Sequence, residues 1–171
     1  MPTTRFFERY RLLADTNQQL AAAGSFEAVL EVLRAQARAI ADCDGVAVVR
    51  RDGDQVEYVG EDAIAPLWTG QRFPIERCIT GLAILQHEPI VIPDIGKDPR
   101  VPLGAYLATF VKSMAVYPLG RPAPCAALGL YWREVKPLGR DVEALMGLLA
   151  QSANVAFERN AIRAERAGLA A

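Results

Sequence analysis

The stretch from Cys78 to Leu119 constrains the fold more than any other part of this sequence, because its secondary structure changes several times over a short distance. Its first segment, Cys78–Gln86, is apolar enough to predict a half-buried helix, and the Thr80 hydroxyl lies near the free N–H groups at the start of that helix. Pro89 ends the helix, because the residue before a proline is pushed out of the helical conformation.

The rest of this stretch predicts a strand, a turn, a second helix and a second strand. The β-branched run Ile90–Ile92 lies between two prolines and predicts a short strand near a sheet edge. Residues Asp94–Arg100 have the composition of a turn, and 103–112 and 113–119 follow as a helix and a strand. We expect segments 79–88 and 103–112 to form a lid over one face of a sheet, with a chamber beneath it.

Turn signals between neighbouring strands predict antiparallel pairing. Asp52-Gly53-Asp54 is a hairpin signal between the predicted strands Val46–Arg50 and Gln55–Val59. The connection GRPAPC, which is rich in proline and glycine, joins Ser113–Leu119 to Ala126–Trp132 and suits a hairpin loop. The sheet is therefore predicted to be mainly antiparallel.

Residues 60–77 show no regular period, because two prolines and a glycine interrupt them. They predict a loop, and we expect Trp68 and Phe73 to anchor this loop to the body of the domain.

Long helices are predicted at both ends of the chain. Residues 5–22 and 26–42 repeat apolar side chains at spacings of three and four, and a longer helix begins at Gly139 or Asp141. Together with the hairpins, these helices predict one α+β domain over residues 1–171 with α/β/α layers. The long terminal helices cover one face of the sheet, and the short lid helices cover the other.

Composition and charge argue against several classes of function. The chain has 19 basic and 20 acidic residues and no basic run, which predicts binding neither to nucleic acid nor to a membrane surface. No apolar segment reaches the roughly 18 residues of a membrane helix, and the N-terminus lacks the pattern of a signal peptide, so we expect a cytoplasmic protein. The cysteines, Cys43, Cys78 and Cys125, are odd in number and far apart, as expected for reduced thiols. One histidine and no CxxC pair predict no metal site.

Four segments, taken in order, carry a resemblance to a known family. They are SFEAVLEVLRAQARAIADCDGVAVV, TGLAILQHEPIVIPDIGKDPR, SMAVYPLG and LGLYWREVKPLGRDVEALMGLLAQSANVAFERN. With these segments the chain resembles the GAF domain over residues 10–162, and it looks closest to the GAF domains of proteobacterial sensor histidine kinases. The resemblance implies a six-stranded antiparallel sheet, a cavity between the sheet and the lid helices, and dimerisation through the terminal helices, 1–24 and 138–168.

In functional terms, the resemblance implies a non-enzymatic module that senses a small molecule in bacterial signal transduction. The ligand state would pass through the terminal helices of a homodimer to an output partner such as a histidine kinase. The residues expected to bind the ligand, whose identity stays open, are Cys78, Thr80, Asp94, Arg100, Tyr106, Phe110, Ser113, Tyr117 and Tyr131.

Several of these residues also have a structural interpretation. Cys78 near a helix N-terminus is either a reactive thiol or a small buried apolar residue. Asp94 either binds a ligand amine or hydroxyl, or caps the turn that follows it. Arg100 either binds a carboxylate or phosphate, or pairs with Asp98 or Asp94.

The predicted strands offer a possible pocket wall. In SMAVYPL, Ser113 and Tyr117 share one face, because side chains alternate along a strand. In the next strand, Gly129 shares a face with Tyr131 and leaves room beside it. We interpret these two faces as parts of one wall.

The family resemblance allows particular cofactors to be tested. The NKxnFxxxDE pattern of cyclic-nucleotide-binding GAF domains is absent from the sequence. Bilin-binding domains hold the chromophore through a cysteine that is usually followed by histidine in the cyanobacterial group, whereas His87 lies nine residues after Cys78. We expect His87 to be a solvated residue at a helix end and not a haem ligand. The resemblance therefore predicts neither bilin nor haem.

Two other functions stay open. In the free methionine sulfoxide reductases, which share this fold, the nucleophilic cysteine lies in the loop after the aspartate, where this chain has VPLGAYL. Without that thiolate we expect no such activity. The second of these two hypotheses is an interaction or dimerisation module whose cavity is filled by its own side chains.

Overall fold

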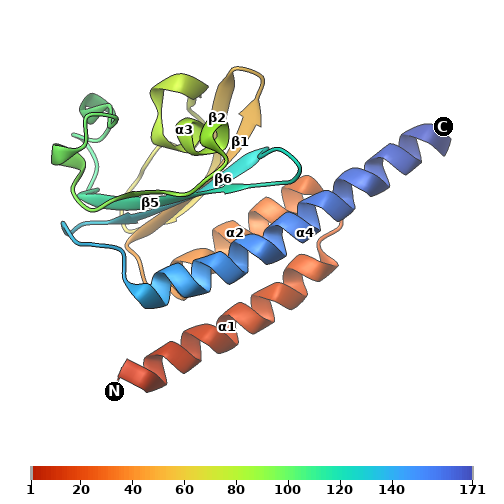
Figure 1. The fold of residues 1–171 in the computed structure, drawn as a ribbon, viewed down its shortest axis with the longest axis horizontal. Helices are drawn as coiled ribbons and strands as arrows, with labels where there is room; N and C mark the ends of the chain where they lie inside the picture. Colours follow the sequence, from red (N-terminus) through yellow and green to blue (C-terminus); the bar gives the residue numbers. More distant parts are fainter. Residues whose placement is uncertain (1, 171) are drawn as a thin grey trace.

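The structure, a computed structural model, describes residues 2–170 and has three layers (Figure 1). One layer consists of three helices, α1 (Pro2–Ala22), α2 (Phe26–Ala41) and α4 (Arg140–Ala170). The short helix α3 (Ile79–Gln86) lies on the opposite face of the sheet, together with three single 3₁₀ turns at Ile75–Arg77, Ile95–Lys97 and Leu103–Ala105. The predicted α/β/α arrangement is confirmed. None of the described helices combines the length and the apolar character that a bilayer span requires.

The middle layer is a six-stranded sheet with the order β3-β2-β1-β6-β5-β4, in which every neighbouring pair is antiparallel. The strands are β1 (Gly45–Asp52), β2 (Gln55–Ala63), β3 (Arg72–Pro74), β4 (Ile90–Ile92), β5 (Ser113–Leu119) and β6 (Ala126–Trp132). Asp52 pairs with Gln55, and Gly53 has φ of +63°, so the predicted hairpin is present and uses glycine where the backbone is left-handed. The three-residue strand β3 was predicted as part of a loop, because its short pairing with β2 has no sequence period of its own.

The predicted helix over 103–112 is wrong, because only Leu103–Ala105 forms a single 3₁₀ turn. A helix there would need the Ala105 carbonyl to accept from Thr109 N–H, but the Trp68 indole N–H donates to that carbonyl at 3.0 Å. Thr109 N–H instead donates to the Tyr106 carbonyl at 2.9 Å. The backbone thus forms a tighter turn here, and the Trp68 indole bonds the Ala105 carbonyl that this turn leaves free.

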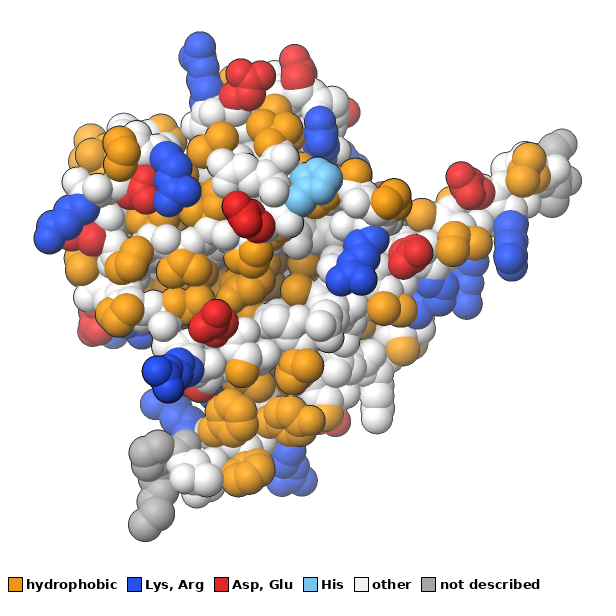
Figure 2. Space-filling view, in the orientation of Figure 1, with side chains coloured by type: hydrophobic (Ala, Val, Ile, Leu, Met, Phe, Trp, Pro, Cys, Tyr) orange, Lys and Arg blue, Asp and Glu red, His pale blue; other side chains and the backbone are white. Residues whose placement is uncertain are grey.

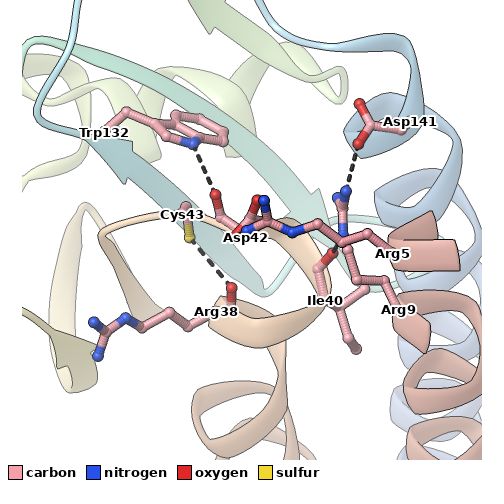
Figure 3. A network of polar contacts seen from close by, with 8 residues as sticks. All are labelled: Arg5, Arg9, Arg38, Ile40, Asp42, Cys43, Trp132 and Asp141. Carbon is pink, nitrogen blue, oxygen red and sulfur yellow. Dashed lines mark hydrogen bonds and ion pairs between the residues drawn. The ribbon is translucent and has the colours of Figure 1, made fainter. Parts of the chain in front are cut away.

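The N-terminal half of α1 is fastened to the body by a network of polar contacts (Figure 3). The buried Arg9 donates to the Ile40 carbonyl at the end of α2 and pairs with Asp141 at the start of α4. Partial burial acts to raise the pKa of Asp141, but the Arg9 guanidinium outweighs it, and this pKa lies below its ordinary value. Nearby, Arg5 pairs with Asp42, whose carbonyl accepts from the indole of Trp132 on β6. The end of β6 is therefore connected to α1 through Asp42.

The other end of α1 is held by α4. Arg159 donates to the carbonyls of Leu20 and Ala23, and Asn160 also donates to the Ala23 carbonyl. A cation and an amide thus satisfy carbonyls left free where α1 ends. Since α1 is bonded to α4 at both ends, we expect the two helices to move together.

Candidate ligand site under the lid

Five aromatic side chains fill the space between the sheet and the lid, and we call them the lid cluster: Tyr58, Trp68, Phe73, Tyr106 and Tyr131. Trp68 lies at its centre, with ring centroids 4.9 Å from Tyr106, 5.3 Å from Tyr131 and 5.5 Å from Tyr58. All three pairs meet edge to face, the arrangement that aromatic quadrupoles favour.

Polar groups are built into this aromatic interior. The hydroxyls of Tyr58 and Thr80 share a hydrogen bond of 3.1 Å, and Thr80 lies 3.5 Å from the Cys78 sulfur. Thr80 was expected to face the start of α3, but its hydroxyl points into the lid cluster, and Cys78 occupies the N-cap position without capping a backbone N–H through its side chain. The hydroxyl of Tyr131 lies near that of Tyr58, but it makes no hydrogen bond of ordinary distance and angle with this or any other residue that the structure describes.

The position of the Tyr131 hydroxyl explains why residue 129 is a glycine. A Cβ at Gly129 would lie 2.2 Å from that hydroxyl oxygen and 2.7 Å from the ring carbon that carries it. Tyr131 therefore lies back along β6 over Gly129, and no other residue would leave this space free.

The ionisable side chains of the lid cluster, and the neighbouring Cys78, are held in their neutral forms. Burial raises the pKa of Tyr58, Tyr106 and Tyr131, and it raises the pKa of the Cys78 thiol. The tyrosines therefore remain hydrogen-bond donors at neutral pH, and Cys78 has little thiolate.

Cys78 is expected to react more slowly than Cys125 with iodoacetamide at pH 7.5, because it is 5% exposed whereas Cys125 is half-buried. Only the thiolate reacts, and Cys43 should also be slow, because burial raises its pKa to about 12. Peptide mass mapping after timed alkylation measures the order, and the urea-unfolded chain, in which all three should react alike, is the control. Labelling of Cys78 ahead of Cys125 would restore the reactive-thiol interpretation.

The structure brings together five of the nine residues predicted to bind a ligand. Cys78, Thr80, Tyr106 and Tyr131 belong to the buried lid interior, and Phe110 packs at its edge. The other four lie elsewhere.

Two of these four are used in turns. Asp94 accepts from Gly96 N–H at 2.9 Å and caps the 3₁₀ turn that follows it. The exposed Arg100 donates to both carboxylate oxygens of Asp98, at 3.0 and 2.7 Å. In both cases the geometry matches the structural interpretation.

Ser113 and Tyr117 lie on the wrong face of the sheet for the predicted wall. Tyr117 pairs with Leu128 and packs in the core beneath the terminal helices, whereas Tyr131 pairs with Met114 and faces the lid. Ser113 shares the face of Tyr117 and donates to the Glu134 carbonyl. The alternation within each strand was predicted correctly. The register between β5 and β6, which decides which residues of the two strands share a face of the sheet, cannot be deduced from either segment alone.

Tyr58, Trp68, Phe73 and Met114 were missed as site residues. Tyr58 shares a face of β2 with the buried Val56, two residues before it, and the more exposed residues 55, 57 and 59 alternate with them, which is a signal for side chains facing the core. Trp68 and Phe73 were expected to anchor their loop, and they do so by packing into the lid cluster.

A groove of about 410 Å³ opens beside the lid cluster. Its walls are the loop residues Pro66, Leu67, Trp68, Gln71 and Phe73 and the lid residues Ala105, Ala108 and Thr109. We call it the lid groove. Trp68 lines the groove, and its ring also contacts the ring of Tyr131, whose hydroxyl is unpartnered.

Solved structures of the same fold come from proteins with different activities. The free methionine-R-sulfoxide reductase from Neisseria meningitidis, in complex with its substrate, has a TM-score of 0.77 at 18% identity, over 91% of both chains. The GAF domain of a phosphoenolpyruvate-protein phosphotransferase from Coxiella burnetii has a TM-score of 0.74 at 18% identity, over 95% of this chain and 98% of that one. A phycoerythrobilin-bound GAF domain of a cyanobacterial phytochrome has a TM-score of 0.71 at 16% identity, over 91% of this chain and 96% of that one. At these identities the likeness shows the fold alone.

The sequence itself gives a clearer assignment. Comparison with curated proteins gives no match. The profile of the GAF domain, however, matches residues 25–157, from the N-cap of α2 to the middle of α4, and thus spans the whole sheet and lid described above. This chain belongs to the GAF domain family.

Proposed function

We propose that this chain is a non-enzymatic, small-molecule-sensing module of cytoplasmic bacterial signal transduction. A ligand under the lid changes the packing of the terminal helices in a homodimer, and the change reaches an output partner such as a histidine kinase. One observation carries the proposal. The Tyr131 hydroxyl is buried without a partner in an otherwise satisfied interior, and leaving such a group unbonded costs about 1–3 kcal/mol. A ligand that accepts from this hydroxyl recovers that cost.

The route from the lid to the helices runs through adjacent residues of β6. Tyr131 faces the lid cluster, and Trp132 faces the terminal helices, where its indole donates to the Asp42 carbonyl. Arg5 on α1 pairs with the Asp42 carboxylate, as Figure 3 shows. A displacement of β6 by ligand contact at Tyr131 is thereby passed to α1, and through Arg9 and Asp141 to the start of α4.

The terminal helices also offer a surface for a second copy of the chain. Leu148, Val155, Ile162 and Leu169 are exposed on α4 at intervals of seven residues, which places them in one column along the helix. Figure 2 shows further hydrophobic side chains gathered over the N-terminal half of α1, where Phe7 and Tyr10 are exposed. Val155 is 63% exposed and Leu169 is 88% exposed. Pairing with the same column of a second copy removes these side chains from water.

Charge favours a parallel pair. Glu165 follows Ile162 by three residues and Arg166 follows it by four, so they flank the column on opposite sides. A two-fold axis along the helices sets the acidic flank of one copy against the basic flank of the other. An antiparallel pair would set like charges together, which is unfavourable.

Val155→Asp is expected to convert a wild-type dimer into a monomer at high micromolar concentration. Two aspartates meeting across the column should raise the dissociation constant roughly a hundredfold or more, since an unpaired buried charge costs about 3 kcal/mol. Sedimentation velocity measures this. Val135→Asp is the matched control, because Val135 is 57% exposed but lies after β6, away from the terminal helices, and it should stay dimeric. A wild-type monomer would refute the dimer.

Native mass spectrometry of the freshly purified protein tests the sensing function as a whole. It reports the mass of the oligomer and of any small molecule retained with it. A retained molecule that is lost in Tyr131→Phe supports the proposal, and a thermal-shift screen with no stabilising metabolite opposes it.

One observation favours a second candidate, a ligand-free dimerisation or interaction module. The rings of Trp68, Tyr106 and Tyr131 are each at most 5% exposed, so the lid interior is already filled by its own side chains. In that case the lid serves stability alone, and Tyr131→Phe stabilises the protein without changing any ligand response.

A further inference from the structure

The site under the lid contains no charge. Among the residues that the structure describes, the lid cluster and its neighbours Cys78 and Thr80 have only hydroxyls, a thiol and an indole as polar groups, and the polar side chains that line the lid groove, besides Trp68, are Gln71 and Thr109. The carboxylate beside this loop, Glu61, already accepts from Leu67 N–H at 2.7 Å and from Thr69 N–H at 2.8 Å. Arg100 is paired with Asp98 and exposed.

The absence of charged side chains under the lid restricts the chemical class of the ligand. A carboxylate, phosphate or ammonium group placed in an uncharged, water-poor interior loses its hydration and finds no counter-ion. A neutral molecule does not incur this cost. The interior also favours a flat molecule, because its walls are aromatic faces and edges that stack on planar rings.

Access from the lid groove to Tyr131 involves Trp68. Its ring borders the lid groove on one side and contacts the Tyr131 ring, and its indole N–H donates to the Ala105 carbonyl of the lid at 3.0 Å. The single donor awaiting a partner there is the Tyr131 O–H, which calls for an acceptor on the ligand.

We propose that the lid site binds an uncharged, planar small molecule with a hydrogen-bond acceptor for the Tyr131 hydroxyl, and that Trp68 is the gate which this molecule displaces. The inference rests on the sensing function proposed above and names the class of its ligand.

Fluorine NMR of the protein labelled with 5-fluorotryptophan tests it with three probes: coumarin, which is neutral with a carbonyl acceptor, indole, which is neutral without one, and the anion coumarin-3-carboxylate. The two tryptophans lie on opposite faces of the sheet, Trp68 under the lid and Trp132 beneath the terminal helices. Their signals are assigned with Trp132→Phe. Coumarin is expected to shift the Trp68 signal most, indole less, and coumarin-3-carboxylate not at all.

Tyr131→Phe should weaken coumarin binding about two- to tenfold, the worth of one hydrogen bond, and leave indole unchanged. Tyr117→Phe is the matched control, because the same hydroxyl is removed from the helix side of the sheet, and it should leave both probes unchanged. A Trp68 response to coumarin-3-carboxylate equal to or above that to coumarin overturns the ligand class but leaves a sensing site in place. No Trp68 response to any probe up to its solubility overturns the ligand class and opposes the sensing function as well.

Discussion

Gly81→Ala is expected to destabilise the protein by about 3 kcal/mol or more, at or above the upper end of the range for overpacked interiors. A Cβ at Gly81 would lie 1.9 Å from the Ile75 carbonyl oxygen, 2.7 Å from its carbon and 2.8 Å from the Ile75 Cα. These are backbone atoms, so no rotamer change relieves the contact. The methyl group can be accommodated only if α3 moves away from the 3₁₀ turn at Ile75–Arg77, which opens the lid interior to water.

Gly147→Ala provides the matched control for this experiment. Gly147 also lies within a helix, α4, but a Cβ there meets nothing within 4 Å. Removing a glycine from a helix interior should stabilise the protein by about 0.5–1 kcal/mol. Urea unfolding at equilibrium gives both values, and the opposite signs of the two changes are the result expected. A Gly81→Ala variant as stable as wild type would mean that α3 is not held against the turn.

The layers and the hairpins were predictable from the sequence because their signals are local. Asp52-Gly53-Asp54 specifies a tight turn by its own backbone preferences, and the terminal helices repeat their apolar residues over several turns. Neither signal needs knowledge of what lies opposite in space. The antiparallel sheet then follows, since strands joined by short turns must run in opposite directions.

The lid was less predictable because non-local contacts determine it. The segment 103–112 has a helical pattern, yet Thr109 N–H donates to the Tyr106 carbonyl, and the Ala105 carbonyl accepts from the distant Trp68 indole. Strand β3 exists only because β2 offers it a paired edge. In both cases the deciding partner lies more than ten residues away along the chain, where no periodicity records it.

The same dependence on non-local contacts explains why only some of the predicted site residues lie under the lid. Thr80, Tyr106 and Tyr131 lie under the lid, as the order of elements suggested. Tyr117 does not, because the register between β5 and β6 decides which face of each strand meets the lid, and a shift of one residue would exchange the faces. Arg100 is paired with Asp98, so a side chain predicted to bind a ligand is used within its own turn.

Trp68→Ala is expected to cost about 3–5 kcal/mol, the range for a large aromatic side chain removed from a packed interior. The substitution removes ring contacts with Tyr58, Tyr106 and Tyr131 and leaves the Ala105 carbonyl without its donor. Trp68→Phe is the control, because it keeps most of the ring and loses mainly the N–H bond, at about 1 kcal/mol. Equal losses in the two variants would mean that the bond to the lid, and not the packing, is what Trp68 supplies.

Indole should partly restore the Trp68→Ala protein. The substitution leaves an apolar cavity of indole shape lined by aromatic rings, and such cavities bind a matching apolar molecule. At millimolar indole the melting temperature of Trp68→Ala should rise by mass action, whereas that of Trp68→Phe, whose cavity is largely filled, should rise little. Rescue of this kind requires that the space beside Tyr131 be reachable from water through the lid groove. If indole stabilises both variants alike or neither, the groove does not lead to Tyr131, and the route proposed for the ligand is wrong.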